Sequence, residues 1–483
     1  MTFIGIDIGT TRTKALLYRP GSPSRRIVAS ATPTVSTHLG DFRDAEAVFA
    51  TVVDCISMLL ADLRPAERAE IEGIGLTSLS EEVVLVTSSG ITAGPMPAWY
   101  TSVAKAQALD AGIDPSFSWT KLSWAFEQLS SARSPSFTEH AVAAIKQVTT
   151  LNSYVAGRLA GIDRYPVDES HASRSGFFDV RSGQWQRAIF EQTGWKAELL
   201  PELVVPGSVV STVDPGLAAQ WGLPPAARVV LAGHDHFCGA FGNGVREDGQ
   251  LYISAGTSEA HCLIVSELPK FPLPPTVGVG RFVDGTHFYL HRQLASGHLY
   301  RQWTGLLGID DEDSRSQEDQ KLFAEPIGSR GTTIIPGFDG DTSSSVLNVK
   351  AGSSPHTVLR ALLEGLACAA LHIDRELVTF TNRPIERIIA SGIPCQSPFW
   401  QHLRGHVTAA PLYITDEEEA PALGAALLCQ RATAGAATIG TDCITSSHAT
   451  TTDASLEADY DKLFSRFERE LARTATPSNR VIR

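Results

Sequence analysis

The stretch FIGIDIGTTRTKALLY, from Phe3 to Tyr18, places an aspartate inside an otherwise apolar segment, immediately before a Gly-Thr-Thr turn. Its apolar residues predict two short strands, Phe3–Ile8 and Ala15–Tyr18, joined by a tight turn. We therefore expect Asp7 to be buried, and a buried carboxylate needs a partner because an unpaired buried charge is unfavourable. The sequence allows two kinds of partner: Lys14 on the opposite strand, or a metal ion with its bound water.

Composition limits the classes of function. A chain of 483 residues with 43% hydrophobic and 19% charged residues is expected to form two or three folded domains. Its net charge of -13 disfavours nucleic acid and anionic membranes as partners, because both attract basic surfaces. We find no run of 18 apolar residues and no signal-peptide pattern, so we expect a cytoplasmic protein without a membrane partner.

The cysteines are odd in number, widely spaced and free of CxxC pairs. This pattern favours reduced thiols in the core over a disulfide or zinc framework. The seven are Cys55, Cys238, Cys262, Cys368, Cys395, Cys429 and Cys443.

Strand-like and helical segments alternate along the first half of the chain, which predicts an α/β fold. Apolar spacing predicts helices over 49–63, 143–159 and 357–379, and an amphipathic helix between Leu456 and Leu471. The glycine-rich and charged stretch 242–249 predicts a boundary between two halves.

The second half begins with a copy of the opening pattern. The stretch GQLYISAGTSEAHCLIV, 249–265, again has a strand, a Gly-Thr turn and a second strand. Turns of this kind present several backbone N–H groups and hydroxyls to one point, as a polyphosphate requires. The two turns, Gly9–Thr13 and Gly256–Ser258, therefore predict a nucleotide phosphate site with Mg²⁺ near Asp7. The chain has no GxxxxGK[ST] motif and no GxGxxG between strand and helix, which disfavours Walker-type NTPases and Rossmann dehydrogenases.

The segment VVLAGHDHFCGAFGNG, 229–244, predicts a strand that ends at His234-Asp235-His236 before a helix. Asp235 at this point is consistent with an ordinary helix N-cap. It is also consistent with a catalytic carboxylate, because open α/β sheets bind ligands at the carboxyl ends of their strands. His234, His236 and Cys238 have an atypical spacing for zinc, and we favour a polar sugar pocket instead.

These motifs, in this order, resemble the FGGY carbohydrate kinases, relatives of actin, hexokinase and the chaperone ATPases. The resemblance extends from Phe3 to about Leu428 and implies an α/β fold of two ribonuclease-H-like (actin-like ATPase) domains with a cleft between them. It implies that Asp7 acts on Mg²⁺, mainly through water, and that Asp235 is the catalytic base. The residues that it implies for nucleotide binding are Gly9, Thr10, Thr11, Thr13, Lys14, Gly256, Thr257, Ser258 and Gly392.

The family comparison also sets the expected domain limits. We expect a first domain over 1–245, with the sugar site, first phosphate hairpin and base. We expect a nucleotide-binding domain over 246–445, and a C-terminal helix and tail over 446–483.

The sequence departs from the family where the sugar is read. The usual Trp-x-Asp-x-Arg becomes Trp99-Tyr100-Thr101-Ser102-Val103, and the loop 336–341 lacks the usual arginine. The acidic sugar-binding position is either Glu81 or Glu82, which the sequence leaves open. The residues expected to bind the sugar are Glu81, Trp99, His234, Asp235 and His236.

We therefore expect an enzyme that uses ATP and Mg²⁺ to phosphorylate a hydroxyl of a small sugar, ketose or polyol. Two alternatives are a sugar-responsive binding protein that has lost turnover and an actin-like ATPase without a sugar substrate. Retention of Asp7, Asp235 and both Gly-Thr turns argues against the first, and the loss of Asp and Arg after Trp99 argues for it. A homodimer is left open.

Overall fold

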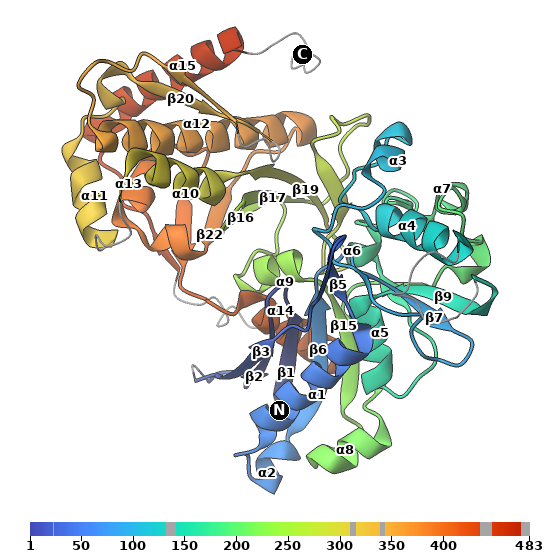
Figure 1. Ribbon diagram of the computed structural model, residues 1–483. Helices are drawn as coiled ribbons and strands as arrows, with labels where there is room; N and C mark the ends of the chain where they lie inside the picture. The colour runs from blue at the N-terminus through green and yellow to red at the C-terminus, as the bar shows by residue number, and fades with distance from the viewer. Residues whose placement is uncertain (23, 132–141, 310–314, 339–342, 435–446, 475–483) are drawn as a thin grey trace. The chain divides into compact units, whose positions relative to one another are not determined.

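A computed structural model describes residues 1–483 except 23, 132–141, 310–314, 339–342, 435–446 and 475–483 (Figure 1). The chain divides into two compact units. The first unit comprises Met1–Gly244, Val279–His287 and Glu419–Ile444, and the second comprises Val245–Gly278, Phe288–Glu418 and Thr445–Arg483.

The first unit is built on a sheet whose strands lie in the order β14-β15-β6-β1-β2-β3. Strands β1 and β2 form the antiparallel hairpin, with Asp7 opposite Lys14, and β1, β6 and β15 run parallel. The strands of this sheet are β1 (Thr2–Ile8), β2 (Arg12–Tyr18), β3 (Arg26–Ala31), β6 (Ile71–Ser78), β14 (Ser208–Thr212) and β15 (Arg228–His234).

Alternation along β1 assigns its residues to two faces of the sheet. Ile4, Ile6 and Ile8 are buried in one core with residues of α1 (Ala45–Leu60) and α5 (Leu151–Leu159). Gly5 lies on the other face, where α14 (Ala420–Ala434) packs so closely that a Cβ on Gly5 would lie 1.8 Å from the Ala422 carbonyl oxygen. Asp7 is two residues further along the strand and therefore shares the face of Gly5.

Three segments differ from the expected domain limits. Residues Val279–His287 belong to the first unit. Helix α14 packs with the first unit because Gly5 and Gly75 let its backbone approach β1 and β6. Helix α15 (Glu457–Thr474) is part of the second unit rather than a separate tail, because its apolar side chains, among them Tyr460 and Phe467, are buried in that unit's core.

The expected helix over 143–159 is partly wrong. Residues Ile145–Thr150 form strand β9, which pairs with β7 (Val83–Thr87), and the helix α5 begins only at Leu151. The Thr150 side chain caps α5 by accepting from the N–H of Ser153. Pairing between distant strands, which local spacing cannot reveal, overrides the helical pattern here.

The second unit repeats the connections of the first. Strands β16 (Gln250–Ala255) and β17 (Glu259–Val265) form an antiparallel hairpin, and β16, β22 (Arg387–Ser391) and β23 (Leu412–Thr415) run parallel. This is the arrangement of β1, β2, β6 and β15, so the sequence repeat is a structural repeat. Strands β19 (Phe288–Leu294), β17, β16, β22, β23 and β24 (Ser447–Ala449) lie in that order.

Helix α12 (Pro355–Thr381) lies in the core of the second unit (Figure 1). By length and composition it could cross a membrane, but 78% of its most apolar window is buried inside the protein, as in the core helix of a globular domain.

The remaining elements complete the two units. The strands are β4 (Val35–Thr37), β5 (Gly40–Arg43), β8 (Met96–Pro97), β10 (Val167–Asp168), β11 (Phe178–Asp179), β12 (Gln184–Trp185), β13 (Leu203–Val204), β18 (Gly278–Arg281), β20 (Thr333–Pro336) and β21 (Ser344–Leu347). The helices are α2 (Pro65–Arg68), α3 (Lys105–Asp110), α4 (Ser118–Ser131), α6 (Glu169–Ala172), α7 (Arg187–Glu191), α8 (Pro215–Trp221), α9 (Asp235–Gly242), α10 (Ser296–Leu307), α11 (Arg315–Ala324) and α13 (Pro398–His406).

Candidate active site

Three carboxylates of the first unit follow the carboxyl ends of neighbouring parallel strands. Asp7 lies at the end of β1, Glu81 follows β6 and Asp235 follows β15. The register places Asp7 beside Thr77 of β6, and His234 beside the next residue of the same strand. The sheet therefore brings the predicted metal residue and the predicted base to one edge, where α/β sheets bind ligands.

Asp7 is buried, with 5% of its surface exposed, and no described residue forms a hydrogen bond with its Oδ1 atom. Burial, together with the charge of Asp235, raises the pKa of Asp7 to about 8. Lys14 instead forms an ion pair with Glu419, with 2.6 Å between Nζ and Oε2. The sequence allows Lys14 or a metal ion as the partner of Asp7. Because Lys14 pairs with Glu419, the position of Asp7 suits a cation.

The Gly9–Thr13 turn is held by its own backbone and by Thr32. The N–H of Gly9 donates to the Arg12 carbonyl at 3.1 Å, and the Thr32 hydroxyl donates to the Gly9 carbonyl at 2.8 Å. Thr13 is fully buried and its hydroxyl lies 3.0 Å from that of Thr32, so it stabilises the turn from inside. Thr11 is exposed and available to a ligand.

A buried arginine, Arg43, links this turn to the Trp99 loop. Its guanidinium donates to the Thr10 carbonyl and to Glu82, with 3.3 Å between Nε and Oε1. Glu82 also accepts from the N–H of Trp99 at 3.3 Å, and the Trp99 indole donates to the Thr10 hydroxyl at 3.1 Å. Burial raises the pKa of Glu82 to about 7 despite Arg43. Glu82 thus supports the Trp99 loop. The role of Arg43 was not predicted from the sequence.

Glu81 occupies the position that we expected for a sugar-binding carboxylate. It accepts hydrogen bonds from the Ser80 hydroxyl and from Nε of Arg174, each at 2.7 Å. Burial favours a raised pKa, but the charges of Arg174 and His234 prevail and lower the pKa of Glu81 to about 2. Glu81 is close enough to His234 for the charge of His234 to lower its pKa, whereas Glu82 is bonded to Arg43 and to the Trp99 loop. Arg174 was not predicted.

Asp235 is the first residue of α9, and His234 occupies the N-cap position. One carboxylate oxygen, Oδ1, lies 2.7 Å from Nδ1 of His234 and 2.6 Å from the backbone nitrogen of His236. Burial would raise the pKa of Asp235, but the hydrogen bond and charge of His234, together with His236, hold it below its ordinary value. Asp235 is therefore an ionised carboxylate with one oxygen fixed, and the N-cap interpretation does not describe it.

The zinc alternative finds no support in the part of the chain that is described, where no three His, Cys, Asp or Glu side chains are placed to hold a metal ion. Cys238 is fully buried, and burial raises the pKa of its thiol. Burial likewise lowers the pKa of His236. Of the seven cysteines, six are buried and unpaired, and Cys443 lies outside the described residues.

The second Gly-Thr turn belongs to the second unit. The N–H of Gly256 donates to the Ser258 carbonyl at 2.9 Å, and α10 packs on the turn through Gly297, whose Cβ would lie 2.1 Å from the Gly256 carbonyl oxygen. The Thr257 hydroxyl accepts from Arg301 at 3.3 Å. Arg301 brings a cation to this turn, and sequence reasoning missed it because the residue lies 44 positions away.

Gly392 lies directly after β22 with φ +117°, which favours glycine. A Cβ on Gly392 would lie 1.9 Å from the Ala255 carbonyl oxygen, so the position admits only glycine. The next residue, Ile393, is 65% exposed. A flat apolar ligand could therefore approach the backbone closely here.

The residues that replace the usual Asp and Arg after Trp99 are buried. Thr101 donates its hydroxyl to the Asp41 carbonyl at 2.7 Å, and Val103 packs in the core of the first unit with Phe42 and Met96. In the loop 336–341, residues 339–341 lie outside the described residues.

The two units have sheets with the same strand connections, each with a Gly-Thr hairpin, and the first adds a carboxylate after a parallel strand. These features define a protein of the actin-like ATPase fold. Family models agree: the N-terminal domain of the FGGY family of carbohydrate kinases matches residues 2–242, and the C-terminal domain matches 251–433. The chain belongs to this family of phosphotransferases.

Individual relatives are distant. A xylulose kinase of Haemophilus influenzae is 28% identical over 298 residues, 59% of this chain and 58% of the relative. Glycerol kinase 1 of Thermotoga maritima is 22% identical over 459 residues, 89% of this chain and 90% of the relative. The crystal structure of a xylulose kinase from Rhodospirillum rubrum superposes with a TM-score of 0.86 at 21% identity, covering 98% of this chain and 99% of that one. This likeness shows the fold.

Proposed function

We propose that the protein transfers the γ-phosphoryl group of ATP to a hydroxyl of a small sugar, ketose or polyol, with Asp235 as the general base. The observation that carries the proposal is the state of Asp235. One oxygen is held by His234 and by the N–H of His236, and no described residue hydrogen-bonds to the other oxygen, Oδ2. A carboxylate fixed through one oxygen can accept a proton on the other in a defined direction.

Asp7 fits a magnesium ion bound through water. Mg²⁺ in kinases commonly keeps several waters and takes one or two carboxylates besides the phosphates. The buried Oδ1 of Asp7, which has no hydrogen-bond partner among the described residues, offers such a ligand. When bound, Mg²⁺ neutralises charge on the phosphates. We assign Thr10 and Thr11 to the phosphates through their backbone N–H groups and hydroxyls, and Gly9, whose N–H donates to the Arg12 carbonyl, to the shape of the phosphate turn.

In the second unit, we assign Gly256, Thr257 and Ser258 to the phosphates as well, and Gly392 to the adenine ring. Arg301, which donates to the Thr257 hydroxyl, adds a positive charge at this turn.

Lys14 of the first unit is assigned an indirect role in nucleotide binding, because its ammonium group pairs with Glu419.

The chain's own part in the chemistry is to orient the acceptor and hold its proton. The pKa of Asp235 lies below its ordinary value, so the side chain is ionised at neutral pH and ready to accept the proton of the attacking hydroxyl. Asp235 accepts this proton as the hydroxyl oxygen attacks the γ-phosphorus. Because the transition state of phosphoryl transfer is loose, the protein needs to contribute little other covalent chemistry.

For the sugar we propose hydrogen bonds with Glu81, His234 and His236, and packing of the sugar ring against Trp99, whose indole N–H already donates to Thr10. Glu81 is ionised, and each of its oxygens, one bonded to Arg174 and the other to Ser80, keeps a lone pair for a sugar hydroxyl. The relatives named above act on xylulose and on glycerol. Because Thr101 and Val103 are buried, we propose a substrate that differs from both in the part usually read by Asp and Arg.

The same departure favours a second candidate, a protein that binds a sugar without turning it over. An assay of ADP release with and without a panel of sugars, polyols and sugar acids separates the two. Release that depends on one of these acceptors supports the kinase, and binding of an acceptor without ADP release supports the second candidate. Release without any acceptor would indicate a simple ATPase. We place the protein in the cytoplasm, with its small-molecule substrate.

A further inference from the structure

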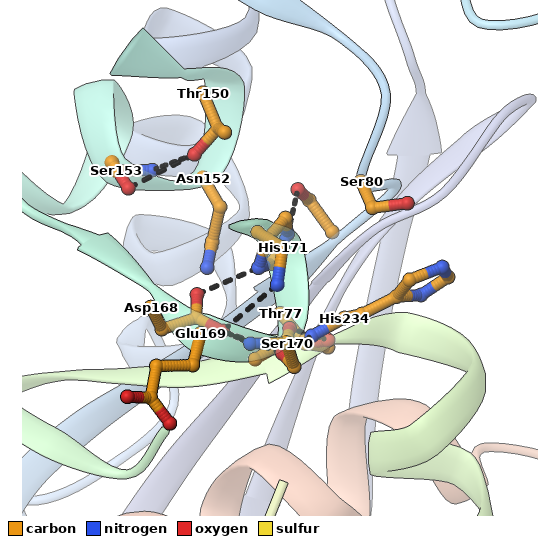
Figure 2. A network of polar contacts seen from close by, with 12 residues as sticks. Thr77, Ser80, Thr150, Asn152, Ser153, Asp168, Glu169, Ser170, His171 and His234 are labelled. Atoms are coloured by element: carbon orange, nitrogen blue, oxygen red, sulfur yellow. Dashed lines mark hydrogen bonds and ion pairs between the residues drawn. The ribbon is translucent and has the colours of Figure 1, made fainter. Parts of the chain in front are cut away.

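The peptide unit between Gly233 and His234 lies at the end of β15, directly before Asp235. Both of its polar groups bind side chains: the Thr77 hydroxyl donates to the Gly233 carbonyl at 2.6 Å, and the His234 N–H donates to the Ser170 hydroxyl at 2.9 Å (Figure 2). The register of β15 shifts between Leu231 and Gly233, and Gly233 has φ +129°. The strand therefore leaves regular geometry at this point, and two hydroxyls hold the peptide that leads into Asp235.

Ser170 is oriented to accept. Its own proton goes to Oδ1 of Asp168 at 2.5 Å, which leaves its lone pairs for the His234 N–H. Asp168 is fully buried and also accepts from the backbone N–H groups of Ser170 and His171, at 3.1 and 3.2 Å. Because the carboxylate has several fixed donors, the Ser170 hydroxyl cannot easily rotate away from His234.

His171 completes this network. Its Nδ1 lies 2.6 Å from Oδ2 of Asp168, and because a carboxylate can only accept, Nδ1 donates there. Its Nε2 lies 3.3 Å from the Ser78 hydroxyl, which also lies 2.7 Å from the Leu79 carbonyl. Burial lowers the pKa of His171, but the charges of Asp168, Asp235 and Glu81 raise it above its ordinary value.

A purely structural role explains only part of this arrangement. Asp168 is the N-cap of α6, which accounts for its bonds to backbone N–H groups. A cap on a four-residue helix requires neither the buried bond from His171 nor the bond from His234 to Ser170. A Cβ on Gly233 would lie 2.6 Å from Cγ1 of Val283 and 2.7 Å from the Ser170 hydroxyl oxygen, so a side chain at this position would displace Ser170.

We propose that Ser170, oriented by the buried Asp168–His171 pair, is a positioning residue for the catalytic base and acts by holding the peptide unit that precedes Asp235. The inference rests on the proposed function, because it requires Asp235 to be the base. A base displaced by a fraction of an ångström loses alignment with the acceptor hydroxyl, while the contacts that bind ATP and sugar remain.

The first test is Ser170→Ala, with Ser153→Ala as its matched control. Ser153 is also a fully buried serine of the first unit and accepts from Thr150 at 2.9 Å, but no bond connects it to β15 in the network of Figure 2. We expect Ser170→Ala to lower kcat by roughly 10- to 100-fold and to change KM for ATP and sugar by less than about threefold. Ser153→Ala should retain kcat within about threefold at a similar loss of melting temperature. Equal kcat values for the two variants would overturn the proposal.

The second test combines Ser170→Ala with Asp235→Asn. If Ser170 acts through the base, the double variant should be no slower than Asp235→Asn alone. Independent, multiplying losses would overturn the proposal. The assay also separates this inference from the proposed function: absence of acceptor-dependent turnover in the wild type, or full activity of Asp235→Asn, contradicts the proposed function itself.

A third test does not depend on activity. In a ¹H–¹⁵N spectrum of histidine-labelled protein at pH 7, Nδ1 of His171 should carry a proton, and Asp168→Asn should change this signal while the protein stays folded. A wild-type His171 whose Nδ1 carries no proton would overturn the orientation argued for Ser170, because Asp168 would then lack this donor.

Discussion

Lys14 faces Asp7 across the hairpin but forms its ion pair with Glu419, with 2.6 Å between Nζ and Oε2, and its charge offsets only part of the rise in the pKa of Asp7. Asp7 is left buried, and its Oδ1 has no hydrogen-bond partner among the described residues. A buried carboxylate without a hydrogen-bond partner destabilises the folded protein when it is ionised. Such a residue is expected at a functional site, where a ligand supplies the partner.

Asp7→Asn should therefore stabilise the metal-free protein at alkaline pH. The pKa of Asp7 is about 8 in the folded chain against an ordinary value of 3.8, so folding takes up a proton between these two pH values. Stability contributed by this group is complete at low pH and is lost as pH rises toward 8, by roughly 1.4 kcal/mol per pH unit. Asparagine cannot ionise, so the melting temperature of the variant minus that of wild type should increase from pH 5 to pH 8.

The control is the same comparison with Mg²⁺ and ATP present. Ligand binding should raise the wild-type melting temperature and leave the variant nearly unchanged. If Lys14 were the true partner of Asp7, the variant would instead lose roughly 3–5 kcal/mol, and Lys14→Met would show the same loss.

Substitutions of the two adjacent glutamates should have different effects. Glu81→Gln should lower kcat/KM for the sugar by roughly 10- to 100-fold, because a hydrogen bond to a charged group contributes about 1.5–3 kcal/mol. Glu82→Gln should stay within about threefold, because the amide oxygen can still accept from Trp99 and Arg43 retains its bonds to backbone carbonyls. Steady-state kinetics of both variants gives kcat/KM for the sugar. A larger loss in Glu82→Gln than in Glu81→Gln would assign Glu82 to the sugar.

Restoring the family's arginine at position 103 should damage the fold without restoring the family's substrates. Val103 is 8% exposed and packed in an apolar core, so Val103→Arg buries a charge without a partner. We expect a loss of about 2–5 kcal/mol, seen as a drop in melting temperature of about 2–4 °C per kcal/mol. Leu109→Arg, which adds the same charge at a side chain 59% exposed, is the control and should melt like wild type. A folded Val103→Arg variant that gains turnover of D-xylulose or glycerol would contradict this account.

The parts of the site that sequence predicts are those in which local pattern and chemistry coincide. Asp7 interrupts an apolar alternation, so its burial could be predicted. Asp235 follows an apolar strand and a glycine, so its position at a strand end could be predicted. The Gly-Thr turns and the repeat of the hairpin were readable for the same reason.

The parts that sequence does not predict depend on contacts between distant segments. Arg43, Arg174 and the Asp168–His171 pair look like ordinary polar residues until the fold buries them beside Glu82, Glu81 and Ser78. Glu81 and Glu82 could not be distinguished because regular strand alternation ends at Ser78. Helix α14 joins the first unit through glycines more than 340 positions earlier, which no local signal records.

The role of Asp235 as the base can be tested by the sugar-dependent kcat of Asp235→Asn. The substitution keeps the size of the side chain and removes its ability to accept the proton. We predict a decrease in kcat of roughly 10²- to 10⁴-fold, with ATP affinity and melting temperature close to those of wild type. A kcat within about threefold of wild type would contradict the account and return Asp235 to a structural role at the start of α9.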